Sequence, residues 1–309
     1  MTAPCIDITQ IPPRFRPAMQ ALATGAAQLS AALRRHRPGE PSPEATADAL
    51  MREALRNAGL RHYASPALPH PLTLDAGGDL ALALDPLSGA DQIGSNGAMG
   101  TIFGIFAARD EAEASFLRPG RDLLAAGYVM HGPRCCLVAG FGGAVRSWQL
   151  DPDSGRFDLV APRLEMPDCS FAFAIDAADY RRWPRPIRAY IDDCLAGTGG
   201  PRARNFSMRW TASLVAETQR ILTQGGIFLD PGGLSRLFHA LPVAFLVEHA
   251  GGRASDGALG ILDAPVASLA ETTPLIFGSP EKVGRVAACH DLPEPEVSAL
   301  FGNRGLFRA

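Results

Sequence analysis

The stretch that decides the fold reads Leu80-Ala81-Leu82-Ala83-Leu84-Asp85-Pro86-Leu87-Ser88-Gly89. Its first five residues are all apolar, a pattern typical of a short strand that is buried on both faces. The run ends at Asp85-Pro86, and the residues that follow favour a tight turn. We therefore expect a buried strand that delivers a carboxylate to a loop at its tip, where catalytic and binding residues are often held.

Helices and strands are expected on both sides of this stretch. Apolar residues at helical spacing predict helices over residues 17–35, 43–57, 184–194, 209–223 and 242–249. Short apolar runs between Gly, Asp and Pro turns predict strands over residues 100–106, 135–141, 147–150, 171–175 and 227–229. Strands clustered mid-chain among helices predict layered α/β structure rather than a helix bundle.

Composition excludes several classes of protein. The chain has 309 residues, 47% of them hydrophobic, so it is long enough to bury a core without disulfides or a structural metal. A net charge of −3 gives no general attraction to nucleic acid or to acidic membranes. No apolar stretch reaches the roughly 18 residues of a membrane span, and the N-terminus has no secretory pattern. We expect a cytoplasmic protein whose cysteines are reduced: Cys5, Cys135, Cys136, Cys169, Cys194 and Cys289.

Four further stretches give the chain a family resemblance. They are Gly100-Thr101-Ile102-Phe103-Gly104-Ile105-Phe106, Leu124-Ala125-Ala126-Gly127-Tyr128, Gly225-Gly226-Ile227-Phe228-Leu229 and Gly278-Ser279-Pro280. Together with Asp85-Pro86-Leu87, they stand in the order and approximate spacing seen in class 1 fructose-1,6-bisphosphatases. The chain resembles that family from about residue 45 to residue 285.

The resemblance implies a fold, an assembly and an activity. The expected fold alternates layers of helices and sheets, in an N-terminal domain over 1–166 and a C-terminal domain over 167–309. The family's subunits usually form a tetramer, so a homo-oligomer is expected. In an active member, carboxylates gather magnesium ions that bridge to the sugar's 1-phosphate, and a water displaces that phosphate in line. Several carboxylates are needed because magnesium prefers hard oxygen ligands.

The chain departs from the family at most metal positions. These positions fall on Asp85, Leu87, Ser88 and His239, where Ser88 replaces an aspartate and His239 a glutamate. The family's Ser-Glu-Glu upstream of the strand is matched here by Ser65-Pro66-Ala67, which has no carboxylate. The aspartate that assists the attacking water is matched by Asp48. Asp48 and Asp85 are therefore expected to be vestigial catalytic residues.

The phosphate-binding positions also differ from the family pattern. They fall on Ser88, Gly89, Ala90, Asp91, Asp176, Arg209 and Asp230. Asp91 replaces a serine of the 1-phosphate site, and Asp176 and Asp230 replace an asparagine and a tyrosine of the 6-phosphate site, so each adds negative charge beside an anion. Lys282, the one lysine of the chain, lies far away in sequence. Arg209 matches the arginine that in the family reaches the 6-phosphate of a neighbouring subunit, although it could equally be an interface ion-pair partner.

Three hypotheses follow. The first is a catalytically inactive or very weak structural or regulatory homologue, without a cofactor, forming a homo-oligomer or a mixed oligomer with an active fructose-1,6-bisphosphatase. The second is an active, magnesium-dependent fructose-1,6-bisphosphatase with a rearranged metal site. The third is a protein with a changed ligand. His239 with Asp85, Asp48 and Asp91 is also a candidate zinc or manganese site, since imidazole suits such ions better than it suits magnesium. The missing carboxylates favour the first hypothesis and make sugar-phosphate binding by this chain doubtful.

Overall fold

The structure is a computed structural model that describes residues 6–37 and 40–290 of the chain. Cys5, the start of the expected N-terminal domain and the end of the expected C-terminal domain therefore lie outside the described residues. Within the described part, no helix is both long and apolar enough to cross a membrane.

A large sheet of eight strands forms one half of the molecule. In spatial order its strands are β2 (Leu72–Thr73), β1 (Leu60–Ala64), β3 (Leu80–Ser88), β4 (Met99–Ala107), β5 (Leu123–His131), β6 (Cys135–Gly140), β7 (Val145–Asp151) and β8 (Arg156–Leu164). Only β1 and β3 pair in parallel, and the other neighbours are antiparallel. The stretch around Asp85 lies in β3, in the middle of this sheet.

A smaller sheet of five strands forms the other half. Its spatial order is β10 (Ser207–Met208), β9 (Ala172–Ala174), β11 (Ile227–Ser235), β13 (Thr272–Gly278) and β12 (Arg253–Ser255). Strand β9 is parallel to both of its neighbours, whereas β13 is antiparallel to β11 and β12.

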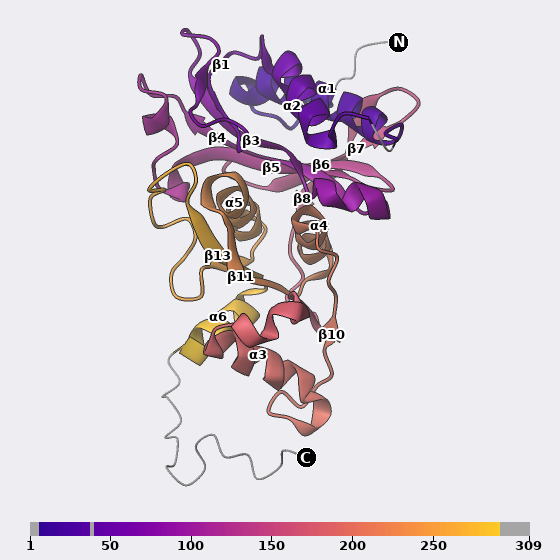
Figure 1. The fold of residues 1–309 in the computed structure, drawn as a ribbon, viewed down its shortest axis with the longest axis vertical. Coiled ribbons are helices and arrows are strands. Elements are labelled where there is room, and N and C mark those ends of the chain that lie inside the picture. The colour runs from indigo at the N-terminus through magenta and orange to yellow at the C-terminus, as the bar shows by residue number, and fades with distance from the viewer. Residues whose placement is uncertain (1–5, 38–39, 291–309) are drawn as a thin grey trace.

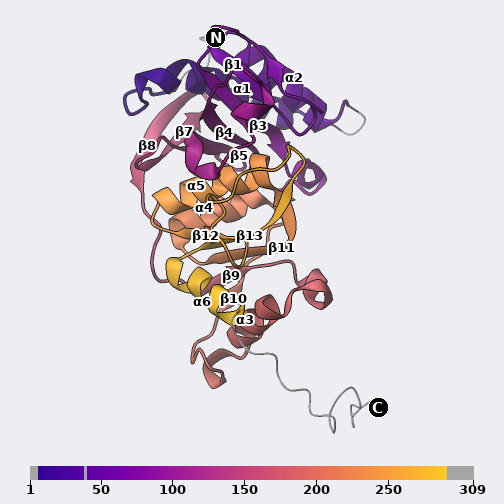
Figure 2. The same ribbon diagram turned by 90° about the vertical axis from the view of Figure 1, so that its left-hand side faces the viewer.

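In the described part of the chain, six α-helices complete a stack of five layers (Figure 1 and Figure 2). They are α1 (Arg16–Leu33), α2 (Pro43–Leu55), α3 (Arg185–Leu195), α4 (Leu214–Gln224), α5 (Leu241–His249) and α6 (Pro280–His290). Helices α1 and α2 cover the outer face of the large sheet, α4 and α5 lie between the two sheets, and α3 and α6 cover the far face of the small sheet. This stack confirms the expected alternation of helical and sheet layers.

Three apolar cores hold the layers together. One core joins α1 and α2 to the large sheet through residues such as Met19, Met51 and Leu82. The central core holds α5, which is apolar all round because both of its sides face a sheet. The third core packs α3 and α6 on the small sheet. Three separate cores in one chain fit the layered architecture.

Two expectations from sequence are wrong in detail. Asp85 does not lie in a loop after the strand: pairing of β3 with β4 continues to Ser88, and Asp85 sits beside an irregularity in that pairing. The helix expected from Arg209 begins only at Leu214. Ala212 has a left-handed backbone, with φ of 54°, and Ser213 caps the helix by accepting from the backbone N–H of Ala216. A left-handed residue cannot continue a right-handed helix.

A buried hydrogen-bond chain fixes the backbone directly after Asp85. The Thr101 hydroxyl on β4 donates to the carbonyl oxygen of Pro86 at 2.8 Å. Having used its one proton, that hydroxyl accepts from Nε2 of His131, 3.3 Å away at the end of β5. Nδ1 of His131 is then the unprotonated nitrogen, facing Sγ of Cys135 at 3.8 Å. Burial, with a smaller contribution from the charge of Arg34, lowers the pKa of His131 to about 4.

The buried, uncharged state of His131 in these hydrogen bonds predicts a specific loss of stability in acid. In the folded state His131 stays neutral down to about pH 4, whereas in the unfolded state it takes up a proton near the ordinary histidine pKa of 6.5. Because the unfolded state binds more protons between these values, the stabilisation is complete above about pH 6.5 and is lost as pH falls through about 4. We expect this histidine to account for roughly 3 kcal/mol of the loss in unfolding free energy.

The measurement is urea denaturation from pH 7 to pH 4 of the wild type and of His131→Gln. The variant should lose less stability over this range, by the amount given above. His70→Gln is the control, because His70 is exposed and should leave the wild-type slope intact. Equal slopes for wild type and His131→Gln would contradict the assignment.

Candidate functional site

Asp85 is held by two hydrogen bonds. Its Oδ1 accepts from the backbone N–H of Leu87 at 3.1 Å, and its Oδ2 lies 2.7 Å from Nε2 of His239. The carboxylate side chain is 13% exposed and the imidazole 19%, so solvent screens this pair only partly. The separation is typical of a short, charge-assisted hydrogen bond, in which Nε2–H donates to the carboxylate.

His239 reaches Asp85 from the other half of the chain. It lies in one turn of π-helix, Arg236–Ala240, between β11 and α5. Buried Arg236 anchors this turn by donating from Nη2 to the carbonyl oxygens of Ile261 and Ala264, at 3.1 and 3.2 Å. Nδ1 of His239 is buried and has no hydrogen-bond partner among the described residues. Single π-helical turns inside helices are frequently found at functional sites.

Asp48 and Tyr63 belong to the same neighbourhood. Burial raises the pKa of the Tyr63 phenol, and the negative charges of Asp48 and, less strongly, Asp85 raise it further. Oδ1 of Asp48 and the hydroxyl of Tyr63 are both buried without a hydrogen-bond partner among the described residues. Oδ2 of Asp48 pairs with Arg52 at 3.5 Å, one turn later on α2. Unsatisfied buried polar atoms are costly, so their gathering near Asp85 is a feature that a purely structural role does not explain.

The segments expected to carry further family residues do not add carboxylates around Asp85. Ser65 begins a turn that exposes Pro66 and Ala67 to solvent. After β3, Gly89 adopts a left-handed backbone with φ of 78°, and Ala90 is buried. Asp91 is exposed, and its Oδ2 accepts from the side chain of Gln92. Solvent therefore weakens the repulsion that Asp91 would exert on a bound phosphate.

The residues present do not fit the family's magnesium cluster. Both oxygens of Asp85 already accept hydrogen bonds, and one of the donors is the imidazole of His239, which from sequence is matched to a glutamate of the family. Among the described residues, no three His, Cys, Asp or Glu side chains are grouped so that they could hold a metal ion. The same observation gives no support to a zinc or manganese site built from His239, Asp85, Asp48 and Asp91.

Two of the residues expected at the 6-phosphate line the same pocket. Asp176 and Asp230 line a pocket of about 300 Å³ together with Asp179, Arg182, Trp183, Trp210, Leu229, Pro231 and Gly232. Oδ1 of Asp230 accepts from the backbone N–H groups of Gly232 and Gly233, and Oδ1 of Asp176 accepts from that of Ala178. Three carboxylates and one guanidinium make this pocket acidic.

Arg209 does not reach that pocket. It is exposed and lines a neighbouring hollow of about 450 Å³ with Arg220, Ser207 and Gln224, among others. The structure therefore brings together Asp85 with His239, and Asp176 with Asp230, and leaves Arg209 apart from both pairs.

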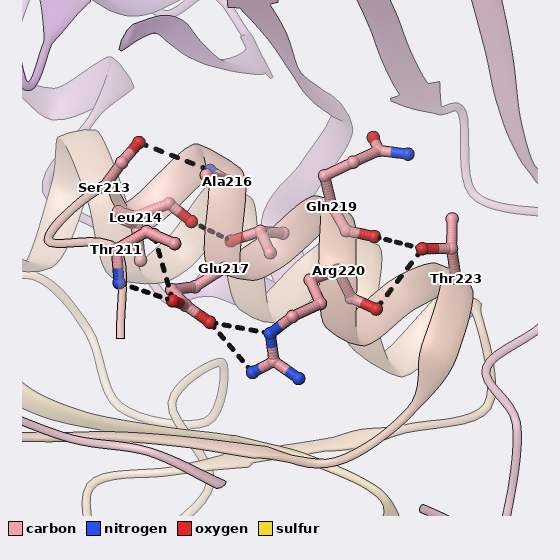
Figure 3. A network of polar contacts seen from close by, with 9 residues as sticks. Thr211, Ser213, Leu214, Ala216, Glu217, Gln219, Arg220 and Thr223 are labelled. Carbon is pink, nitrogen blue, oxygen red and sulfur yellow. Dashed lines mark hydrogen bonds and ion pairs between the residues drawn. The ribbon is translucent and has the colours of Figure 1, made fainter. Parts of the chain in front are cut away.

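A buried glutamate fixes the segment that carries Arg209 (Figure 3). Glu217 on α4 is fully buried, and its Oε1 accepts from the backbone N–H and the hydroxyl of Thr211 at 2.9 and 3.0 Å. Its Oε2 accepts from Nε and Nη2 of Arg220 at 3.0 and 2.8 Å. A buried carboxylate is stable only when it is paired in this way. Thr211, two residues after Arg209, is thereby tied to the helix.

Sequence reasoning missed several of these residues. Asp179, Arg182 and Trp183 line the acidic pocket, and Glu217 holds the segment of Arg209. The spacing of three residues between Asp179 and Arg182, which pair in the structure, was an available signal. The residues around Glu217 did not indicate its role, because its partner Thr211 lies before the start of the helix and not one turn away on it.

Two family models together match most of the chain. The model described as fructose-1-6-bisphosphatase, N-terminal domain, matches residues 46–162. The model described as fructose-1-6-bisphosphatase, C-terminal domain, matches residues 166–291.

Relatives and solved structures agree with these matches. The chain is 51% identical to a class 1 fructose-1,6-bisphosphatase of Paracoccus denitrificans, with all of both chains covered. It is 51% identical to one of Cereibacter sphaeroides over 88% of this chain and 84% of the relative. The crystal structure of Leishmania major fructose-1,6-bisphosphatase in holo form superposes with a TM-score of 0.84 at 25% identity, covering 92% of this chain and 97% of that one. Fold, family models and full-length similarity thus show that the chain belongs to the class 1 fructose-1,6-bisphosphatase family.

Proposed function

We propose that this chain keeps the fold of the fructose-1,6-bisphosphatases without their magnesium-dependent hydrolysis, and serves as a structural or regulatory member of the family. The hydrogen bond of 2.7 Å between Asp85 and His239 carries this proposal. It places an imidazole N–H on the carboxylate of Asp85, so a cation there would have to share this carboxylate with a hydrogen-bond donor and would lie close to the imidazole.

The rate of the reaction makes a partial metal site insufficient. Hydrolysis of phosphate monoesters is among the slowest uncatalysed reactions and needs accelerations of up to about 10²¹-fold. Most of this acceleration comes from positioning the reactants and from stabilising the charge of the transferred group. A site in which Asp85 is already paired and in which Ser88 replaces an aspartate has little left to supply either effect.

The acidic pocket supports the same proposal. A phosphate dianion there would face Asp176, Asp179 and Asp230, and only Arg182 is present to offset them. Arg182 is itself paired with Asp179. The binding of a sugar 6-phosphate in this pocket is therefore opposed by net negative charge.

A working fructose-1,6-bisphosphatase is the second candidate, and the comparisons favour it. The relatives described above are named as fructose-1,6-bisphosphatases, and one of them matches over its full length at 51% identity. The unpartnered oxygens of Asp48 and Tyr63 give this candidate a structural argument, since they leave polar atoms free to meet a ligand beside Asp85. Magnesium can be bound through one or two carboxylates together with substrate phosphate.

Assembly remains a separate proposal. We propose a homo-oligomer or a mixed oligomer with an active relative, in which exposed Arg209 meets a neighbouring subunit. Native mass measurement after co-expression tests it: mixed species are expected, and homo-oligomers alone would exclude the mixed form.

The two candidates differ in a simple assay. With pure protein, magnesium and fructose 1,6-bisphosphate, we expect phosphate release at the background rate. The reason is that the described residues form no group of three or more His, Cys, Asp or Glu side chains that could hold a metal ion to activate water. An active class 1 relative assayed alongside serves as the positive control. A kcat near 1 s⁻¹, within the usual range of enzymes, would contradict the first candidate and establish the second.

Restoring the missing charges should restore metal binding. The variant Pro66→Glu/Ala67→Glu/Ser88→Asp/His239→Glu removes the donor on Asp85 and returns carboxylates to the family positions. We expect it to bind magnesium in isothermal titration calorimetry where the wild type shows no heat. Without magnesium it should be less stable than the wild type, because the carboxylate introduced in place of the imidazole would face Asp85 with like charge.

The matched control carries Gln, Gln, Asn and Gln at the same four positions. It has nearly the same shapes without the charges, so it should bind no magnesium. Equal magnesium affinity of the carboxylate variant and this amide control would show that the four positions do not surround Asp85.

A further inference from the structure

Lys282 stands in an unusual place for the only lysine of the chain. It lies in the first turn of α6, at the end of the molecule farthest from the large sheet (Figure 1). It lines a hollow of about 270 Å³ with Phe171, Arg202, Arg204, Phe206 and Glu281. We call this set of six residues the Lys282 hollow. None of them lines the acidic pocket or contacts Asp85.

The side chain of Lys282 is buried, and the ion pair that the structure gives it is a long one. The residue is 4% exposed. Among the described residues, its Nζ pairs with Oε2 of Glu281, at 3.9 Å. That distance is too long for a hydrogen bond. Burial lowers the pKa of Lys282, the charge of Glu281 opposes this effect and that of Arg202 adds to it. Lysine is rarely buried unless it is paired, and the pairing of Lys282 with Glu281 is too long to satisfy the ammonium fully.

Arg202 is short of partners in the same hollow. Its side chain is 8% exposed, and its Nη2 donates to Oε1 of Glu281 only at 3.4 Å. Its Nη1 is buried with no hydrogen-bond partner among the described residues. The guanidinium is held in place from its faces, because its carbon lies 4.8 Å from the ring centre of Phe206 and 5.6 Å from that of Tyr190. An oriented cation with free donor capacity is suited to bind an oxyanion.

The charge of the hollow is positive. Arg202, Arg204 and Lys282 contribute three cations, and Glu281 is the one carboxylate among the lining residues. Glu281 is moreover shared, since Arg285 lies 3.9 Å from its Oε1. Arg204 is exposed, with its guanidinium carbon 5.0 Å from the ring centre of Phe171 at the rim. One carboxylate therefore neutralises only part of the surrounding positive charge.

We propose that the Lys282 hollow is a binding site for a small dianion of the phosphate or phosphomonoester class. Lys282 and Arg202 supply donors from the floor, and Arg204 closes over the anion from the rim. A phosphate dianion would give the ammonium of Lys282 a closer counter-charge than Glu281 does. Phe171 and Phe206 form an apolar edge beside the site, against which the rest of a phosphorylated metabolite can lie. The proposal does not depend on hydrolysis at Asp85.

Calorimetry and thermal unfolding with inorganic phosphate test this site. The wild type should bind one phosphate per chain, and its melting temperature should rise with phosphate but not with chloride at equal ionic strength. Lys282→Met should weaken binding by about tenfold or more, because a charge-assisted hydrogen bond is lost. Without phosphate its melting temperature should be at least that of the wild type, since an incompletely paired buried charge has been removed.

Arg204→Gln keeps the test decisive if Lys282→Met fails to fold, because Arg204 is exposed and its replacement leaves the core intact. It should weaken phosphate binding severalfold. Arg163→Gln, an exposed arginine on β8, is the control and should bind as the wild type does. No binding by the wild type up to about 10 mM phosphate would overturn the proposal. So would unchanged binding in both hollow variants, or a loss of binding in Arg209→Gln alone. Each of these results would leave the proposed function of the Asp85 site untouched.

Discussion

The contact between Asp85 and His239 joins the two halves of the molecule at the position where the sequence predicts the family's metal site. Asp85 belongs to an interior strand of the large sheet, and His239 to the turn that links the small sheet to α5. The hydrogen bonds of Thr101 behind Pro86 and of Arg236 before His239 fix both ends of this contact. Both oxygens of Asp85 accept hydrogen bonds in this arrangement.

Scaffold and site have separate physical requirements in this chain. The five layers depend on apolar cores. The similarity to a relative extends over the full length of both chains, so it includes the residues of these cores. Catalysis depends on a few polar side chains that a core does not need, so fold and chemistry can vary independently. Two of the hollows also differ in charge: the pocket of Asp176 and Asp230 is acidic, whereas the Lys282 hollow is basic.

Sequence predicted the parts of this structure that depend on local patterns. The apolar run before Asp85 predicted β3, and the cap at Ser42 predicted α2, because burial and capping are readable from neighbouring residues. The start of α4 was predicted wrongly, since the left-handed backbone of Ala212 is not evident from an alanine. The pairing of Asp85 with His239 spans more than 150 positions and depends on the π-helical turn, so periodicity could not reveal it.

The most direct test of the account is a crystal structure of the protein grown with magnesium and fructose 1,6-bisphosphate. The account predicts that Nε2 of His239 stays on Oδ2 of Asp85 at the separation of 2.7 Å, with no cation between them. A magnesium ion coordinated by Asp85 and the sugar's 1-phosphate, with the imidazole turned away, would contradict it.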